Sequence, residues 1–185
     1  MNALTVNEKQ LTIDGVEILG YDDQIVGYSA FKLLMRGVGP HTSNYPNNYV
    51  EFSEVGMSWQ DNVERIGPQY FTVDSTALSG TPWGNGNPDK LFDGSTGGGA
   101  YDKFDAHNFT AAEVQFHTNN LITPSSYSFW SCDNQWSNNA IDYAAPNTFT
   151  FYGKNENTQQ YEELITVSAS QLDLHNSTKT TILAE

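Results

Sequence analysis

Basic residues are scarce in this chain of 185 residues, and that scarcity excludes one large class of partner. There are 8 Lys and Arg against 22 Asp and Glu, which gives a formal net charge of −14. A surface of that sign repels phosphate backbones, and the sequence has no local basic cluster, so we expect no nucleic-acid binding. The length favours one domain that buries a core without covalent cross-links.

Cysteine and long apolar runs are also missing. Cys132 is the only cysteine, so no internal disulfide can form and no cysteine-based zinc site is expected. No stretch approaches the roughly 18 apolar residues that a membrane span requires. The N-terminus has no basic stretch followed by an apolar one, which is the mark of a secretory signal. We therefore expect neither membrane insertion nor export.

Helical periodicity is weak throughout, and short β-type segments are present instead. Apolar, aromatic and β-branched residues alternate with polar ones, and clusters of Asn, Gly and Pro separate the segments. The expected strands are 31–38, 49–59, 72–80, 111–118, 126–132 and 148–154, with one short helical turn at 87–92. Such a series predicts an all-β sandwich or barrel. The side chains expected to point into a sandwich core are Phe52, Val114, Phe116, Phe129, Phe149 and Phe151.

The segment 87–104, NPDKLFDGSTGGGAYDKF, holds an Asp-Gly turn and three consecutive glycines. It is not a phosphate-binding loop, because no Lys follows the glycines and no helix is expected after them. It is not an EF-hand loop either, because the spacing of Asn85, Asn87 and Asp89 lacks the next glycine and the closing Glu. A cation-binding turn of another kind and a plain connection remain open.

Several segments resemble, in order, discoidin or coagulation-factor type C domains, which are galactose-binding-like. They are PDKLFDGSTGGG (88–99), AAEVQFHTNNLITPSSYSFWSCDN (111–134) and APNTFTFYGKNENTQQYEELI (145–165). The Ser-Glu strand that usually lies near the C-terminus of those domains is found early here, as NNYVEFSEVGM (47–57). This order is similar to the permuted arrangement of bacteriophage virion and tail proteins. The resemblance implies a jelly-roll β-sandwich of two antiparallel sheets.

The same resemblance divides the chain into three parts. Residues 30–168 form the galactose-binding-like sandwich, and residues 169–185 form a C-terminal tail. Residues 1–29 form an N-terminal arm or anchoring segment, although an edge strand of the sandwich is the alternative. Because these residues include few large apolar groups, we expect them to become ordered by packing on a partner.

The resemblance also implies a structural calcium ion at the Asp-Gly turn. Carried over to this sequence, Glu54 and Asp93 supply carboxylates, and Lys90, Ser95 and Gly98 supply carbonyl oxygens. Calcium takes six to eight such oxygens in a flexible geometry, which glycine-rich backbone can provide. The alternative is an ordinary tight turn with Glu54 exposed.

Two tryptophans in polar loops are the candidates for ligand binding. Sugars are bound by an aromatic face beneath the ring and by amides, carboxylates or histidines on the hydroxyls. The candidate residues are Trp83, Asn85, Asn87, Asp102, His107, Asn134, Trp136 and Tyr143. The alternative is that the tryptophans cover the ends of the sandwich or contact a neighbouring subunit. The Arg that often opens the sugar loop of the family is absent here.

Catalytic motifs are lacking, since the chain has no Gly-x-Ser-x-Gly elbow and no His-Glu-x-x-His pair, so we expect a protein that is not an enzyme. The expected function is a glycan-binding attachment module on a phage virion, as a tail or capsid-decoration protein. Its partners are cell-surface or mucus glycans and, through the N-terminal arm, other virion subunits in an oligomeric assembly. The alternatives are a purely structural virion adaptor or cement protein with the same fold, and a location on a bacterial surface or in secretions.

Overall fold

The computed structural model describes residues 4–7, 10–13, 16–20, 27–38, 49–82, 84, 86–96, 103–132, 145–174 and 178–184. Within these ranges the regular structure is β, apart from two 3-10 turns, η1 (Pro88–Phe92) and η2 (Ala169–Gln171). The predicted helical turn at 87–92 is therefore confirmed. None of the described helices has the length and hydrophobicity of a membrane span.

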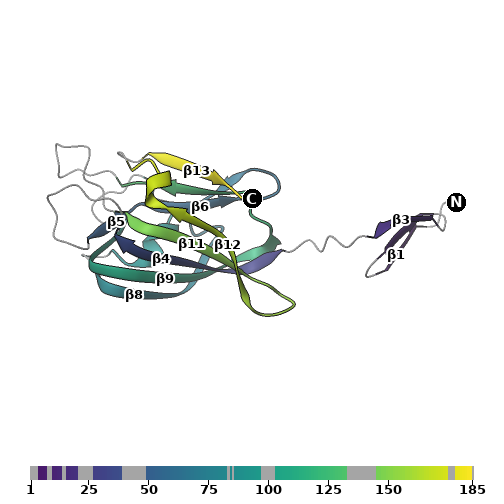
Figure 1. Ribbon diagram of the computed structural model, residues 1–185, viewed down its shortest axis with the longest axis horizontal. Helices are drawn as coiled ribbons and strands as arrows, with labels where there is room; N and C mark the ends of the chain where they lie inside the picture. Colours follow the sequence, from purple (N-terminus) through teal and green to yellow (C-terminus); the bar gives the residue numbers. More distant parts are fainter. Residues whose placement is uncertain are drawn as a thin grey trace.

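Two antiparallel sheets form the body of the protein and lie as two layers (Figure 1). The larger sheet has the order β12-β11-β4-β9-β5, and β8 pairs with β9 as well. Its strands are β4 (Tyr28–Val38), β5 (Val50–Phe52), β8 (Thr72–Pro82), β9 (Phe104–Ile122), β11 (Pro146–Lys154) and β12 (Tyr161–Ser168). The smaller sheet has the order β13-β10-β6-β7. Its strands are β6 (Glu54–Ser58), β7 (Glu64–Arg65), β10 (Ser126–Trp130) and β13 (Lys179–Leu183).

Aromatic side chains from both sheets fill the space between the layers. Phe129 on β10 packs its ring against Phe149 on β11 at a centroid distance of 5.3 Å, and Tyr127 lies 4.7 Å from Phe151. The six residues predicted to point inward are all at most 1 % exposed. Truncating one such phenylalanine to alanine typically costs about 3–5 kcal/mol. The all-β sandwich predicted from the sequence is confirmed.

The chain changes sheets at Ser53, which the sequence pattern did not predict. The single strand expected over 49–59 is wrong, because β5 pairs with β9 in the larger sheet and β6 pairs with β10 in the smaller one. The amide of Ser53 donates to the carbonyl of Trp130 at 3.1 Å, so the corner itself is hydrogen-bonded. Strands that pass from one sheet to the other are a usual way to make a corner in a sandwich. The consequence is that Glu51 and Glu54 belong to different layers.

Strand β9 is longer than the expected segment 111–118 and contains an irregularity. Asn108 has a φ of +52°, and the register between β8 and β9 shifts between Ser79 and Thr81. Gly80, with a φ of +146°, lies at this shift, where a Cβ atom would come within 2.9 Å of the carbonyl oxygen of His107. Glycine is therefore required at position 80, and the bulge lets β9 reach both β5 and β4.

The two ends of the chain also contain strands. Strand β13, within the segment 169–185, pairs with β10 along its whole length. At the N-terminus, β1 (Leu4–Asn7), β2 (Gln10–Ile13) and β3 (Val16–Gly20) form a separate antiparallel sheet. Its register places Leu4 opposite Ile13 and Val6 opposite Leu11. The larger sheet begins at Tyr28, so residues 28 and 29 are part of β4.

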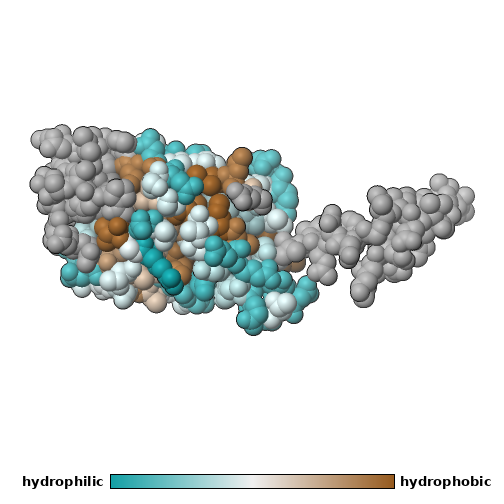
Figure 2. Space-filling view, in the orientation of Figure 1, coloured by the Kyte–Doolittle hydropathy of each residue, from teal (hydrophilic) through white to brown (hydrophobic). Residues whose placement is uncertain are grey.

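The surface of the sandwich mixes hydrophilic and hydrophobic residues (Figure 2). The hairpin loop between β11 and β12 is hydrophilic in this view, in agreement with the exposure of residues 156–160. Among the described residues, the exposed large hydrophobic side chains are Val63, Tyr70, Leu121 and Leu183. They come from separate parts of the chain.

Candidate functional site

The Asp-Gly turn follows η1 and is closed by its own side chains. Pro88 starts the 3-10 turn, and Leu91 and Phe92 anchor it in the core. Asp93 then accepts a hydrogen bond from the amide of Ser95 on Oδ1 at 2.9 Å, and Gly94 has a φ of +85°. An aspartate that binds its own backbone two residues on, followed by a residue at positive φ, is a usual way to make a tight turn. The local sequence is therefore enough to form the turn.

Glu54, the first residue of β6, contacts this turn although it is 40 residues away from Gly94 in the sequence. Its side chain is fully buried, which contradicts the alternative that Glu54 is exposed. Oε2 accepts a hydrogen bond from the amide of Gly94 at 2.9 Å, whereas Oε1 has no hydrogen-bond partner in the structure. Burial, together with the nearby charge of Asp93, raises the pKa of Glu54 to about 9 against the lowering effect of the Gly94 and Gly67 amides. Without a cation, Glu54 is thus protonated at neutral pH.

The predicted calcium ligands are only partly brought together. Oδ2 of Asp93 lies 3.2 Å from Lys90 Nζ, and the carbonyl of Ser95 accepts a hydrogen bond from Ser53 Oγ at 2.9 Å. Gly98 lies outside the described residues. In the part of the chain that the structure describes, no three His, Cys, Asp or Glu side chains are grouped as a metal site. Calcium is coordinated by backbone carbonyl oxygens as well as by carboxylates, so a site need not contain three acidic side chains. The Oε1 atom of Glu54, which has no hydrogen-bond partner and lies beside Asp93, fits such a ligand.

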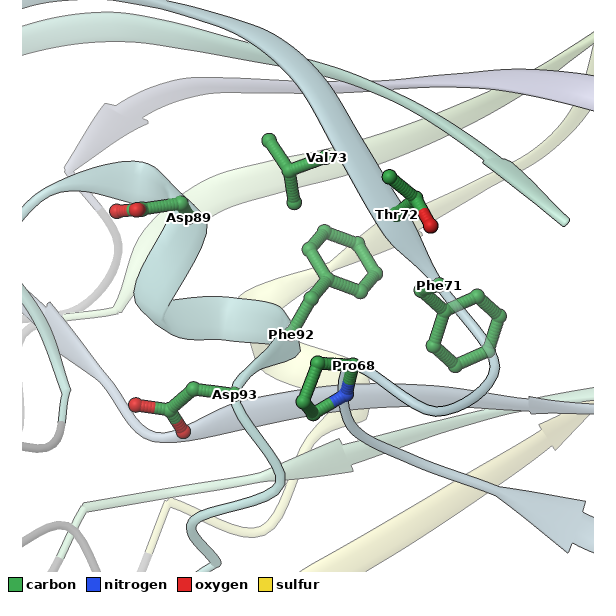
Figure 3. A pocket seen from close by; sticks show the side chains of 7 residues that line it. All are labelled: Pro68, Phe71, Thr72, Val73, Asp89, Phe92 and Asp93. Atoms are coloured by element: carbon green, nitrogen blue, oxygen red, sulfur yellow. The ribbon is translucent and has the colours of Figure 1, made fainter.

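Beside the turn lies an open hollow of about 300 Å³. Figure 3 shows the rings of Phe92 and Phe71 on one side of it, and Asp89 and Asp93 on the other side, with their carboxylates apart from each other and pointing away from the rings. The remaining lining residues are Pro68, Thr72 and Val73. Because both rings are at most 2 % exposed, the hollow offers a ligand little aromatic surface.

A second buried cluster of polar groups lies at the start of β5 and β9. Lys103 Nζ is 2.6 Å from Glu51 Oε2. The hydroxyl of Tyr49 lies 2.7 Å from that same oxygen and 3.0 Å from Asp105 Oδ2. All four side chains are at least nine-tenths buried. The second oxygens, Glu51 Oε1 and Asp105 Oδ1, have no hydrogen-bond partner.

The charges in this cluster do not cancel, and the pKa values shift accordingly. Burial and the charge of Glu51 raise the pKa of Asp105 to about 7, although Lys103 and Tyr49 act in the opposite direction. Burial, Glu51 and Asp105 also raise the pKa of Tyr49. For Lys103, burial opposes the charge, but Cys132 and the carboxylates outweigh it and raise its pKa. The cluster therefore holds one ammonium group, one carboxylate paired with it and one carboxyl group close to its titration midpoint.

Several separate stretches of chain meet at this cluster. The amide of Asp105 donates to the carbonyl of Gly86 at 3.2 Å, which ties β9 to the residues before η1. Cys132, just after β10, is buried and acts electrostatically on Lys103. The ring of His107 meets Tyr49 edge to face at a centroid distance of 4.9 Å. The cluster thus joins chain from both sheets with the segment that leads into the Asp-Gly turn.

Comparisons with known proteins do not identify a relative. No family model, curated protein or solved structure matches the chain.

Most of the predicted ligand-binding residues cannot be placed. Trp83, Asn85, Asp102, Asn134, Trp136 and Tyr143 lie outside the described residues. Asn87 is exposed at the start of η1, and His107 is half-buried on β9. These residues remain predictions. What the structure adds is that the chain next to them, at Gly86, Lys103 and Cys132, meets at the second cluster.

Sequence reasoning missed the second cluster entirely. Glu51, Lys103 and Asp105 are charged residues of the kind that normally lie on the surface. One signal was available, because Glu51 lies in the otherwise apolar stretch YVEF. Its side chain can be exposed there only if one face of the strand is open to solvent. Since β5 is buried along its whole length, this Glu needs an internal cation, which Lys103 provides.

Proposed function

We propose that this protein is a non-catalytic glycan-binding module of a virion surface, with a sandwich of the jelly-roll, galactose-binding-like type. The observation that supports the proposal is the meeting of Gly86, Lys103 and Cys132 at one cluster. The candidate residues Asn85, Asp102 and Asn134 are within two positions of these three in the sequence. Three distant parts of the chain, at Gly86, Lys103 and Cys132, are thereby brought near one another, as a loop-built binding site requires.

The residue types at these positions suit a sugar. The indoles of Trp83 and Trp136 can stack beneath an apolar sugar face, and the neighbouring amides can bind hydroxyl groups. The net charge of −14 disfavours acidic glycans such as sialylated or sulfated chains, so the expected ligands are neutral. A shallow site of this kind binds weakly, on the order of millimolar, and becomes useful through many copies.

Calcium at the Asp-Gly turn is part of the proposal as a structural ion. The buried Oε1 of Glu54 lacks a partner, and Asp93 lies beside it. A bound Ca²⁺ would give both carboxylates a cation and would keep Glu54 ionised. Lys90 would then leave Asp93 or bind it on the side away from the ion.

The alternative is a structural virion subunit that uses the same fold without a sugar site. The N-terminal sheet favours this alternative, because β1, β2 and β3 pair with one another and, among the described strands, with none of the body. Its register pairs apolar residues, as in Leu4 with Ile13, and an apolar sheet face is stabilised when it is buried against another surface. Both functions are compatible with an arm that holds the subunit in an assembly.

A glycan array separates the two functions. The protein is displayed as a multimer on beads, and binding is compared with that of Trp136→Ala and of Tyr70→Ala. Tyr70 is a matched control because its half-exposed ring packs on Trp59, away from the cluster. We expect neutral glycans to bind, Trp136→Ala to lose at least about tenfold in apparent affinity, consistent with a stacking contribution of more than about 1.4 kcal/mol, and Tyr70→Ala to bind normally.

Two results would decide against glycan binding. Multimeric protein that retains no glycan favours the structural alternative. An equal loss in both variants means that the loss reflects general destabilisation and not a contact with sugar.

A further inference from the structure

The two carboxyl groups of the second cluster, those of Glu51 and Asp105, share one hydroxyl hydrogen, that of Tyr49. The geometry therefore requires a further proton on one of the two carboxyl groups. The hydroxyl of Tyr49 has one hydrogen, yet its oxygen lies within hydrogen-bond distance of a carboxyl oxygen of Glu51 and one of Asp105. A phenol donates once and accepts otherwise. If both carboxyl groups were ionised, one of these two contacts would bring lone pairs together in a buried site. One of the two carboxyl groups must therefore carry a proton.

Asp105 is the residue that carries it. Glu51 already accepts a hydrogen bond from the ammonium group of Lys103 on the oxygen that faces Tyr49, whereas Asp105 forms no such ion pair among the described residues. Asp105 then donates a hydrogen bond to Tyr49, and both Tyr49 and Lys103 donate hydrogen bonds to Glu51. Burial and the charge of Glu51 raise the pKa of Asp105 to about 7, which agrees with Asp105 as the protonated group.

We propose that the proton of Asp105 closes a latch between β9 and the stretch of chain that enters β5, and that this latch, with the adjoining amide bond from Asp105 to Gly86, weakens when Asp105 ionises. Among the described residues, the titratable groups that act on Asp105 are Tyr49 and Glu51 from the β5 side and Lys103 on its own stretch of chain, and Cys132 after β10 acts on Lys103. The ring of His107 contacts Tyr49, the hydrogen-bond partner of Asp105. Ionisation turns a donor toward Tyr49 into an acceptor and places two carboxylates against one ammonium group. The latch does not depend on whether the protein binds glycans.

The direction of the pH effect follows from the proton balance. In the closed form Asp105 binds its proton up to about pH 7, whereas an exposed Asp releases it near pH 4. The equilibrium constant for opening the latch therefore rises about tenfold per pH unit between about pH 4 and pH 7. Above that range it stays constant. The latch is tightest in mildly acidic solution and weakest just above neutrality.

Nuclear magnetic resonance of the full chain tests the proposal directly. The carboxyl carbon of Asp105 should titrate near pH 7. Protection of the Asp105 amide, which donates to Gly86, should fall about tenfold per pH unit from pH 5 to 7, after correction for intrinsic exchange, and then level off. A titration midpoint near 4 overturns the proposal, even if no variant folds.

Two variants complete the test. Asp105→Asn keeps a donor toward Tyr49 but cannot ionise, so its amide protection and melting temperature should lose the part of the pH dependence between pH 5 and 7 that Asp105 contributes. Asp61→Asn is the matched control: Asp61 is exposed and its pKa is lowered to about 2, by its hydrogen bond to Arg65 foremost, so the wild-type pH dependence should persist. If Asp105→Asn shows the same pH dependence as the wild type, Asp105 is not the latch.

Discussion

Glu51 and Glu54 are close in sequence and lie on either side of the point where the chain changes sheets. Both are buried, and both have one oxygen without a partner. Glu51 faces an ammonium group at 2.6 Å, whereas Glu54 interacts with the amides of Gly94 and Gly67 and with the carboxyl group of Asp93. One carboxylate is therefore neutralised from within the chain, and the other needs a proton or an added cation. Burial alone does not determine the state of a carboxyl group; its nearest charged neighbour does.

The largest effect is expected from removing the internal cation. Lys103→Met leaves Glu51 buried without a counter-ion, which should lower the free energy of unfolding by about 3–5 kcal/mol. Urea denaturation measures the change. Lys179→Met is the matched control, since Lys179 forms a half-exposed pair with Glu64 and should cost less than about 1 kcal/mol. Equal losses of unfolding free energy in the two variants would show that the buried Lys103–Glu51 pair stabilises the protein no more than the exposed pair does.

A smaller effect is expected at Glu54, from calcium. A calcium concentration at 100 times the Kd stabilises the native state by about 2.7 kcal/mol, which for a chain of this size corresponds to roughly 5–10 °C in melting temperature. Chelation should remove this gain in the wild type, whereas Asp93→Ala and Glu54→Gln should show little gain to remove. Glu51→Gln should keep a calcium response if it folds. Identical melting with and without chelator would mean that the turn binds no calcium.

Calcium binding should also depend on pH in a direction set by Glu54. Because its pKa is raised to about 9, the ion must displace a proton at neutral pH, and the affinity should rise by up to about tenfold per pH unit between pH 6 and 8. In calcium-free buffer the same group makes the protein less stable as the pH rises from about 4.5 to 9. Calorimetric titration at several pH values measures the affinity, and an affinity independent of pH would exclude Glu54 as a ligand.

The smallest effect is expected at Ser53, between the two glutamates. Its hydroxyl donates to the carbonyl of Ser95 at 2.9 Å and so ties the corner to the Asp-Gly turn. Ser53→Ala should lower the free energy of unfolding by about 1 kcal/mol, whereas the exposed Ser75→Ala should change it little. A loss at Ser53 no greater than that at Ser75 would mean that this link does not stabilise the corner.

The sequence was sufficient for the fold class and for the core. Alternating apolar residues predicted the strands around Phe116, Phe129 and Phe151, because a strand with one buried face has a period of two. The same rule failed at 49–59, where both β5 and β6 are buried on both faces, so that no periodicity marks the change of sheet at Ser53. Strand β13 gave no apolar signal because it depends on pairing with β10.

For the candidate sites, the sequence predicted one cluster and missed the other. The Asp-Gly turn has a local signal, and a resemblance connected it to Glu54 across a gap in sequence. The cluster around Glu51 and Lys103 has one local signal, a Glu in the apolar stretch YVEF, but its partners are not marked, because these residues meet only after β5 pairs with β9. Long-range pairing of this kind cannot be inferred from residue spacing.

The order of strands in the larger sheet has a consequence for synthesis of the protein on the ribosome. Strand β4 is made early, yet its two neighbours are β9 and β11, which end at Ile122 and Lys154. At about 5–20 residues per second, β4 emerges with its apolar face, which includes Phe31 and Leu33, and waits on the order of ten seconds for both partners. During that interval it is an unpaired hydrophobic strand, the kind of segment that nascent-chain chaperones cover and that drives aggregation when expression outruns them.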